Sequence, residues 1–152
     1  MTDSIIIKAC PCGGLRGGVN TSGGKKRTPT YAQCCEPFHL GLPAPTAETL
    51  MRSRYSAFAL GVKSCLHDYL QATWHPRTRP AQSAANEGVA LEWLGLTITH
   101  QVTVDATHAK VRFIARYRTL GRVHRLVETS QFVREVAPDG MLRWFYVDGE
   151  VK

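Results

Sequence analysis

Four of the chain's five cysteines form two tight pairs near the N-terminus, and these thiols carry the most definite chemistry in the sequence. Cys10 and Cys12 flank a proline, whereas Cys34 and Cys35 are adjacent. Adjacent α-carbons lie about 3.8 Å apart, and ordinary disulfides need roughly 4.4–6.8 Å, so the second pair is poorly placed to form a bridge. Two pairs of thiolates instead match the four soft ligands of a tetrahedral zinc site.

The zinc interpretation has two alternatives, which are four reduced cysteines without a metal and a redox role for the adjacent pair. His39 is a further nitrogen donor close to the second pair. Because four cysteines already fill a zinc tetrahedron, we expect His39 to pack beside the site or support its ligands. The sequence therefore predicts one structural zinc, held by Cys10, Cys12, Cys34 and Cys35.

The composition of the chain changes near Thr46. Residues 1–45 are dense in Gly, Pro, Cys, Ser and Thr, whereas apolar periodicity begins only after them. A chain of 152 residues suffices for one domain with a hydrophobic core and a small metal-stabilised appendage. We therefore expect a zinc-binding module over 1–45, with the long segment Gly13–Gln33 between its cysteine pairs, and an α+β domain over 46–152.

Two helices are predicted after this boundary. Thr46 is a suitable N-cap, and an apolar stripe then recurs at helical spacing. The stripe consists of Met51, Tyr55, Phe58 and Val62. A second stripe over 62–70 indicates another helix, which should end around His75 because the proline after it disfavours helical geometry.

The rest of the chain reads as strands after a polar loop over 77–88. Alternation with period two predicts one apolar face in the first strand. That face comprises Leu94, Leu96, Ile98, His100, Val102 and Val104. Further strands are expected over 109–120, 123–135 and 141–148, joined by short turns. Two helices followed by four hairpin-linked strands predict helices packed on one face of a curved antiparallel meander.

The motifs also resemble those of known proteins. The Cys10-Pro11-Cys12-Gly13 sequence, followed by Tyr31 and the adjacent cysteines, resembles the SEC-C motif, a small zinc module. The order of this motif and four later ones resembles the YchJ-like family of bacterial proteins; those later motifs are Leu50–Phe58, Thr73–Pro76, Glu92–Leu96 and Trp144–Gly149. The resemblance implies a nuclear transport factor 2-like fold, a cystatin-like cone in which a curved sheet wraps a helix.

Polar residues of the second segment are candidates for a pocket or for a structural cluster. Glu128 shares a strand face with apolar residues, and a lone buried carboxylate is costly, so we expect it to pair with Arg52 or Arg54. Together with a histidine or a tyrosine it can alternatively supply acid–base catalysis. The residues considered for that role are His75, His124 and Tyr146. The structural pairing is favoured, because no carboxylate dyad or nucleophile–base spacing is visible.

The net charge bears on partners. The chain carries 19 Lys and Arg against 12 Asp and Glu, a formal charge of +7, which favours an acidic protein or a nucleic acid surface. No apolar run approaches the roughly 18 residues needed to span a membrane, and we expect a cytoplasmic protein. A non-enzymatic binding or adaptor protein is the first hypothesis, and a pocket enzyme or small-molecule binder is the second. A homodimer is a further expectation.

Overall fold

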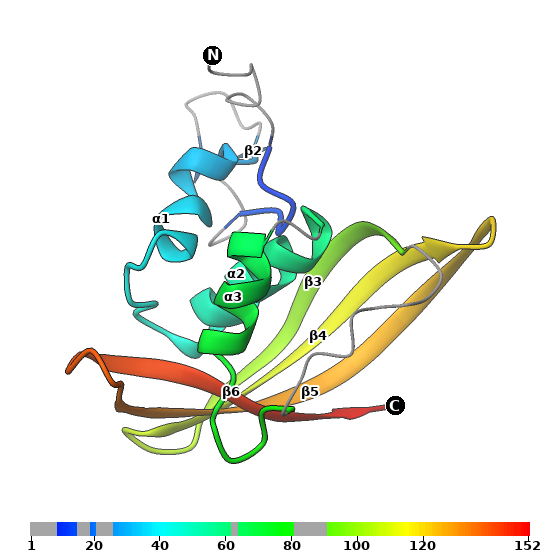
Figure 1. Cartoon of the computed structure of the whole chain (residues 1–152). Coiled ribbons are helices and arrows are strands. Elements are labelled where there is room, and N and C mark those ends of the chain that lie inside the picture. The colour runs from blue at the N-terminus through cyan, green and yellow to red at the C-terminus, as the bar shows by residue number, and fades with distance from the viewer. Residues whose placement is uncertain (1–8, 15–18, 21–25, 62–63, 81–90) are drawn as a thin grey trace.

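The computed structural model describes residues 9–14, 19–20, 26–61, 64–80 and 91–152. Helix α2 (Ala47–Ala59) lies against one face of a four-stranded antiparallel sheet, and α3 (Ser64–Ala72) packs on α2; the sheet curves around α2 (Figure 1). The order of elements confirms the predicted α+β architecture. The predicted helix position Val62 and residues 81–88 of the predicted polar loop lie outside the described residues.

The sheet is a meander in sequence order, β3-β4-β5-β6. Its strands are β3 (Glu92–Thr103), β4 (His108–Thr119), β5 (Arg122–Val136) and β6 (Leu142–Val151). Leu120 and Gly121 have positive φ angles of 51° and 77° at the β4–β5 turn, a conformation that glycine adopts without steric cost. All four strands were expected, with boundaries close to those observed.

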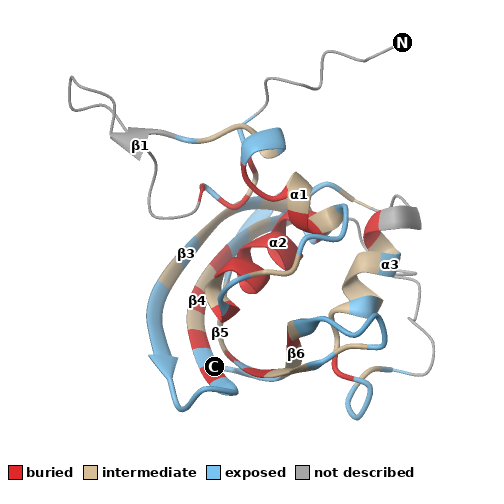
Figure 2. Ribbon diagram, turned by 90° about the vertical axis from the view of Figure 1, so that its left-hand side faces the viewer, coloured by how far each residue is buried: buried red, intermediate tan, exposed pale blue. Residues whose placement is uncertain are grey.

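Helix α2 is buried far beyond the amphipathic pattern expected for it, as Figure 2 shows by its colour. Thr46 caps it as predicted, because its side chain accepts a hydrogen bond from the Thr49 amide. Every residue from Leu50 to Ala57 is buried, whereas Phe58, expected in the core, is 43% exposed. The helix is enclosed because the sheet covers one side and the cysteine segment covers another, so even its polar residues leave the solvent.

The predicted inward face of β3 is wrong at several positions. Two irregularities, between Trp93 and Gly95 and between Ile98 and His100, shift the register against β4. A bulge places one extra residue in the strand and so moves the following side chains to the other face. Consequently Trp93 packs against the core, while apolar positions predicted to face inward are exposed: Leu94 at 36%, Val102 at 53% and Val104 at 55%.

The N-terminal segment carries only short elements. These are β1 (Val19–Asn20), β2 (Lys26–Arg27), the 3₁₀ helix η3 (Tyr31–Gln33) and α1 (Glu36–His39). Strands β1 and β2 pair within the segment between the cysteine pairs. The four cysteines belong to the same buried cluster as α2 and the sheet, so the core continues across residue 46. The predicted division into modules stays a prediction. None of the described helices has the length and apolar character needed to cross a membrane.

We expect Leu50→Ala to lower the free energy of unfolding by about 2–5 kcal/mol, the usual cost of a cavity at a buried leucine. Leu50 is 2% exposed and lies on the enclosed helix. Leu40→Ala is the matched control, because Leu40 is 80% exposed and its truncation should change stability by less than about 0.5 kcal/mol. Denaturant unfolding measures both, and equal effects would contradict the placement of α2 in the core.

Candidate metal centre

The first cysteine pair lies on a turn that is tied to the second half of the module. An isolated bridge joins Ala9 to Thr30, and the Cys10 amide donates to the Pro29 carbonyl at 2.9 Å. Gly14 closes the turn with a φ of 95°, and a side chain there would collide with Pro29. Glycine is therefore required for the turn that brings the Gly14 amide within 3.3 Å of the Cys12 sulfur.

The second pair sits at a junction between two short helices. Thr30 and Gln33 form a capping box around η3, and the Cys34 amide then donates to the Tyr31 carbonyl at 3.0 Å. Cys35 occupies the N-cap position of α1. Two consecutive turns thus fix the backbone, and both adjacent side chains are directed toward the first pair.

The four sulfur atoms lie in a compact buried group, with exposures of 0–3%. Their spacings are 3.7 Å for Cys10–Cys12, 3.5 Å for Cys12–Cys34, 3.6 Å for Cys12–Cys35 and 3.9 Å for Cys34–Cys35. All of the sulfurs lie within 4.8 Å of one another, and all four cysteines are free. Metal–sulfur bonds of about 2.3 Å in a tetrahedron give sulfur–sulfur edges of about 3.8 Å. The group therefore has the dimensions of a four-thiolate metal site.

The electrostatics of the group also fit a cation. Hydrogen bonding with neighbouring thiols, that of Cys12 first, lowers the pKa of Cys10. Contacts of the same kind, with Cys10 first, raise the pKa of Cys34 and of Cys35. Without a cation, ionisation of one sulfur thus opposes ionisation of the next. A divalent ion would remove this conflict by accepting all four sulfurs as thiolates.

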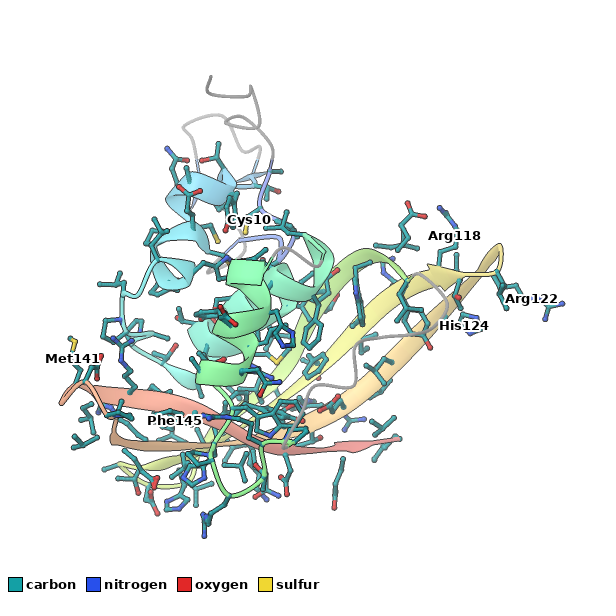
Figure 3. The ribbon with its side chains drawn as sticks, viewed as in Figure 1. Cys10, Arg118, Arg122, His124, Met141 and Phe145 are labelled. Atoms are coloured by element: carbon teal, nitrogen blue, oxygen red, sulfur yellow. The ribbon has the colours of Figure 1, made fainter. Side chains whose placement is uncertain are left out.

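Helix α2 supplies the groups that surround the sulfurs, and Figure 3 shows Cys10 on the side of α2 away from the sheet. The Ser56 hydroxyl lies 3.2 Å from the Cys35 sulfur and 3.4 Å from the Cys10 sulfur. Arg52, one turn earlier, donates to the Cys12 carbonyl at 2.9 Å and lies 3.7 Å from Glu48. Sequence reasoning missed Ser56. The one sequence feature that could have indicated Ser56 is its position four residues after Arg52, which places both side chains on the same face of the helix.

His39 supports the site and is not a ligand candidate, as expected. Its Nδ1 lies 2.6 Å from the Tyr31 hydroxyl, and its Nε2 lies 2.7 Å from the Ser53 carbonyl. A carbonyl only accepts, so Nε2 carries the proton and Nδ1 accepts from the tyrosine. Burial lowers the pKa of His39, which agrees with a neutral ring that ties the cysteine segment to α2.

Glu128 does not form the predicted ion pair. Among the described residues it makes no ion pair with Arg52 or Arg54. Instead it accepts hydrogen bonds from Ser130 at 3.1 Å and from the Tyr146 hydroxyl at 3.3 Å. Arg54 reaches the same tyrosine differently, with its guanidinium 4.6 Å from the ring centroid. Tyr146 therefore connects the arginine to the carboxylate, through its ring on one side and its hydroxyl on the other.

The buried guanidinium of Arg54 is satisfied by the backbone and by aromatic rings. It donates to the Leu70 carbonyl at 2.8 Å and to the Thr73 hydroxyl at 2.7 Å, and the Trp74 ring centroid lies 5.5 Å away. Burial lowers the pKa of Arg54 to about 10, so it remains charged at neutral pH. This arrangement fastens α2 to α3 and the sheet, which is a structural role.

Both histidines proposed for catalysis lie apart from Glu128. His75 Nε2 contacts Glu135 at 2.7 Å, and Glu135 lies seven residues from Glu128 along β5, on the opposite face of the strand. His124 stacks on Tyr117 with ring centroids 5.2 Å apart, and Figure 3 shows it near the end of the β4–β5 hairpin. Of the six residues predicted for the cluster, the structure brings together only Arg54, Glu128 and Tyr146.

A hollow of about 250 Å³ opens beside the β3–β4 turn. Its lining comprises Val104, Asp105, His108, Ala109, Lys110, Gln131 and Phe132. None of the six predicted cluster residues contributes to it. This hollow therefore does not bring Glu128 together with a histidine.

The fold and the cysteine site define a class of protein in which an NTF2-like domain carries an N-terminal group of cysteines that can bind a metal. Comparison with known proteins agrees. The model of the YchJ middle NTF2-like domain matches residues 46–149, which is more than half of the chain. The chain belongs to the YchJ-like family.

Relatives of similar length support this assignment. The UPF0225 protein of Ralstonia nicotianae is 46% identical, over 94% of this chain and 91% of the relative. The UPF0225 protein of Bordetella parapertussis is 45% identical, over 95% and 93%. A crystal structure of a SEC-C motif containing protein from Psychrobacter arcticus shares 29% identity with a TM-score of 0.75, covering 97% of this chain and 85% of that one. The solution structure of a SEC-C motif containing protein from Rhodopseudomonas palustris shares 30% identity with a TM-score of 0.65, over 89% and 98%.

We expect Ser56→Ala to weaken metal retention by about 10–100-fold, the usual effect of losing a group that supports metal ligands. Ser53→Ala is the matched control. It lies on the same helix, is equally buried, and its hydroxyl contacts Tyr69 rather than a sulfur. Competition with a chromogenic chelator measures retention, and equal weakening in both variants would contradict a specific role for Ser56.

Stability should fall as the pH drops below about 6.5, in part because of His39. Its pKa is lowered in the folded chain, whereas in the unfolded chain it returns to about 6.5. The unfolded state then binds more protons in this range, which lowers the free energy of unfolding. Denaturant unfolding at pH 7.5 and 6.0 should give a smaller difference for His39→Gln than for the natural chain. An unchanged difference would contradict this assignment, since the contribution of the thiols is common to both proteins.

Proposed function

We propose that the four cysteines hold one zinc ion with a structural role. The single observation that carries this proposal is the set of four buried sulfurs at the edge lengths of a thiolate tetrahedron. Zinc favours an all-thiolate tetrahedral site. Four protein ligands leave no position for water or substrate, so the ion would stabilise the fold rather than perform chemistry.

The ion would act by fastening the N-terminal segment to α2. The segment has little regular structure of its own, and in the described residues it reaches the helix through Ser56, Arg52 and His39. Each of these contacts depends on the position of the cysteine turns. Because an unfolded chain offers no preformed site, the binding free energy of the metal contributes directly to folding.

We further propose that the protein is a non-enzymatic binding protein, in which the α+β domain, stabilised by the metal site, presents a surface to another macromolecule. The charge of +7 supports an acidic partner. The dispersal of the predicted acid–base residues also supports it, because Glu128 and His75 each have structural partners. The acid–base alternative requires Glu128 and a histidine to converge on one site, whereas His75 contacts Glu135 and His124 stacks on Tyr117.

Protein purified without added metal should contain about one equivalent of zinc. Replacement of one ligand, as in Cys12→Ser, should reduce the zinc content and lower Tm, because three thiolates and a serine hydroxyl no longer form a closed four-thiolate site. Cys65→Ser is the control, since Cys65 lies outside both pairs in the sequence. Elemental analysis and thermal unfolding with and without a chelator measure these effects. A natural chain that contains no metal, and whose Tm a chelator leaves unchanged, would refute the proposal.

A further inference from the structure

One face of the sheet carries a concentration of positive charge that neither the metal site nor the core explains. Strand β4 alternates strictly, with Ala109, Val111, Phe113 and Ala115 buried against the helices. The intervening side chains point to the opposite face, and Arg125 of β5 joins them there. We define the β4–β5 basic face as Lys110, Arg112, Arg116, Arg118 and Arg125.

Among the described residues, Arg118 is the one member of the β4–β5 basic face that forms a direct ion pair, and the carboxylates of Asp148 and Glu150 on β6 lie two strands away in the rows of Lys110 and Arg112. Arg118 lies 2.9 Å from Glu92, and both side chains are about half exposed. The other four members form no ion pair among the described residues. Figure 3 shows Arg118 and Arg122 extending outward from the end of the β4–β5 hairpin, so the positive charge continues to the tip.

Arg116 and Arg125 are the most informative members, because they are direct cross-strand partners. Like charges directly opposite each other on neighbouring strands destabilise a sheet. Both side chains are exposed, so packing does not require them. The guanidinium of Arg116 also lies across Gly95 of β3, where a larger residue would displace it. Repulsion between two exposed arginines does not stabilise the fold, and such departures from local stability are typical of functional sites. An anion bound between them would remove the repulsion.

We propose that the β4–β5 basic face binds the phosphate backbone of nucleic acid. The inference rests on the proposed function as a binding protein and names its partner and surface. Protein interfaces bury an apolar centre from which charged residues are depleted. The β4 row of this face instead carries four cations and Ile114, whose strand partner is Val127. Arginine predominates over lysine, and its planar fork matches phosphate oxygens.

The spacing of the face suits a repeating polyanion. Successive outward residues of β4 lie about 6.8 Å apart, so Lys110 to Arg118 extends over about 27 Å. If five cations each neutralise one phosphate of a single strand, log K should fall with log salt with a slope of about −3.5; for a duplex the slope is about −4.5. The affinity would then fall by roughly 100–500-fold between 50 and 200 mM salt.

Charge reversal at Arg125 tests the proposal in the full-length, metal-loaded protein. Fluorescence anisotropy would use a 20-nucleotide single-stranded RNA and a duplex of the same sequence, at salt concentrations from 50 to 200 mM. Arg125→Glu should weaken binding at least tenfold and make the salt slope shallower by at least 0.7. The same change places a glutamate opposite Arg116, so Tm should be unchanged or higher. A residue that serves only stability would not give weaker binding together with an equal or higher Tm.

The control is Arg77→Glu, the same charge change at an exposed residue near His75. His75 contacts Phe145, whose strand partner Val133 lies eight residues from Arg125 along β5, roughly 27 Å away. Arg77 lies nearer the Lys110 end of the face, since Val133 is two residues from Gln131, the strand partner of Lys110, so Arg77→Glu should weaken RNA binding much less than Arg125→Glu. Zinc content, measured in every variant, should not change, so failure of the metal proposal and failure of this one give different results.

Three outcomes would overturn the inference. They are absence of binding to both RNAs at 50 mM salt, equal binding by Arg125→Glu and the natural chain, and equal weakening by Arg77→Glu. Polyglutamate serves as the acidic-protein probe. If it bound more tightly than RNA at matched charge, and Arg125→Glu abolished that binding, the face would be a site for an acidic protein and the nucleic acid assignment would be wrong.

Discussion

The enclosure of helix α2 is the constraint on which the rest of the structure depends. The sheet covers one side of it and the cysteine turns cover another, so residues 50–57 are all buried. Two arginines and two serines lie within that stretch, and each buried polar group needs a partner. Arg52 and Ser56 face the cysteines, whereas Arg54 and Ser53 face α3. The polar groups of one helix thereby set the positions of its neighbours.

This arrangement makes the cysteine segment part of the domain's core rather than an attachment to its surface. The sulfurs share a buried cluster with the apolar side chains of α2 and β4. A metal that closes the four sulfurs would therefore stabilise the domain as well as the turns that hold them. His39 has the same effect without a metal, because it accepts a hydrogen bond from Tyr31 and donates to the backbone of α2. The stability of the cysteine segment and that of the α+β domain are thus coupled.

The polar residues between α2, α3 and the sheet form hydrogen bonds and ring contacts that hold these elements together. Arg54 gives its donors to the end of α3 and its charged face to two aromatic rings. Tyr146 contacts Arg54 through its ring and Glu128 through its hydroxyl. Glu128 and Tyr146, which the sequence offers as acid–base candidates, therefore have structural hydrogen-bonding partners. The arginine and lysine side chains of the β4–β5 basic face lie instead on the outer face of the sheet, away from the core.

The sequence alone determined the four cysteines, the α+β class, the Thr46 cap and the order of the strands, because each depends on local spacing, turn chemistry or periodicity. The tertiary structure decided what surrounds each element. The bulges in β3 moved Trp93 inward and Leu94 outward, and the packing of two layers on α2 buried its polar residues. Ser56 became a neighbour of the sulfurs, and Glu128 met a tyrosine rather than an arginine. These contacts join residues distant in sequence, and local patterns carry no information about partners that only folding brings together.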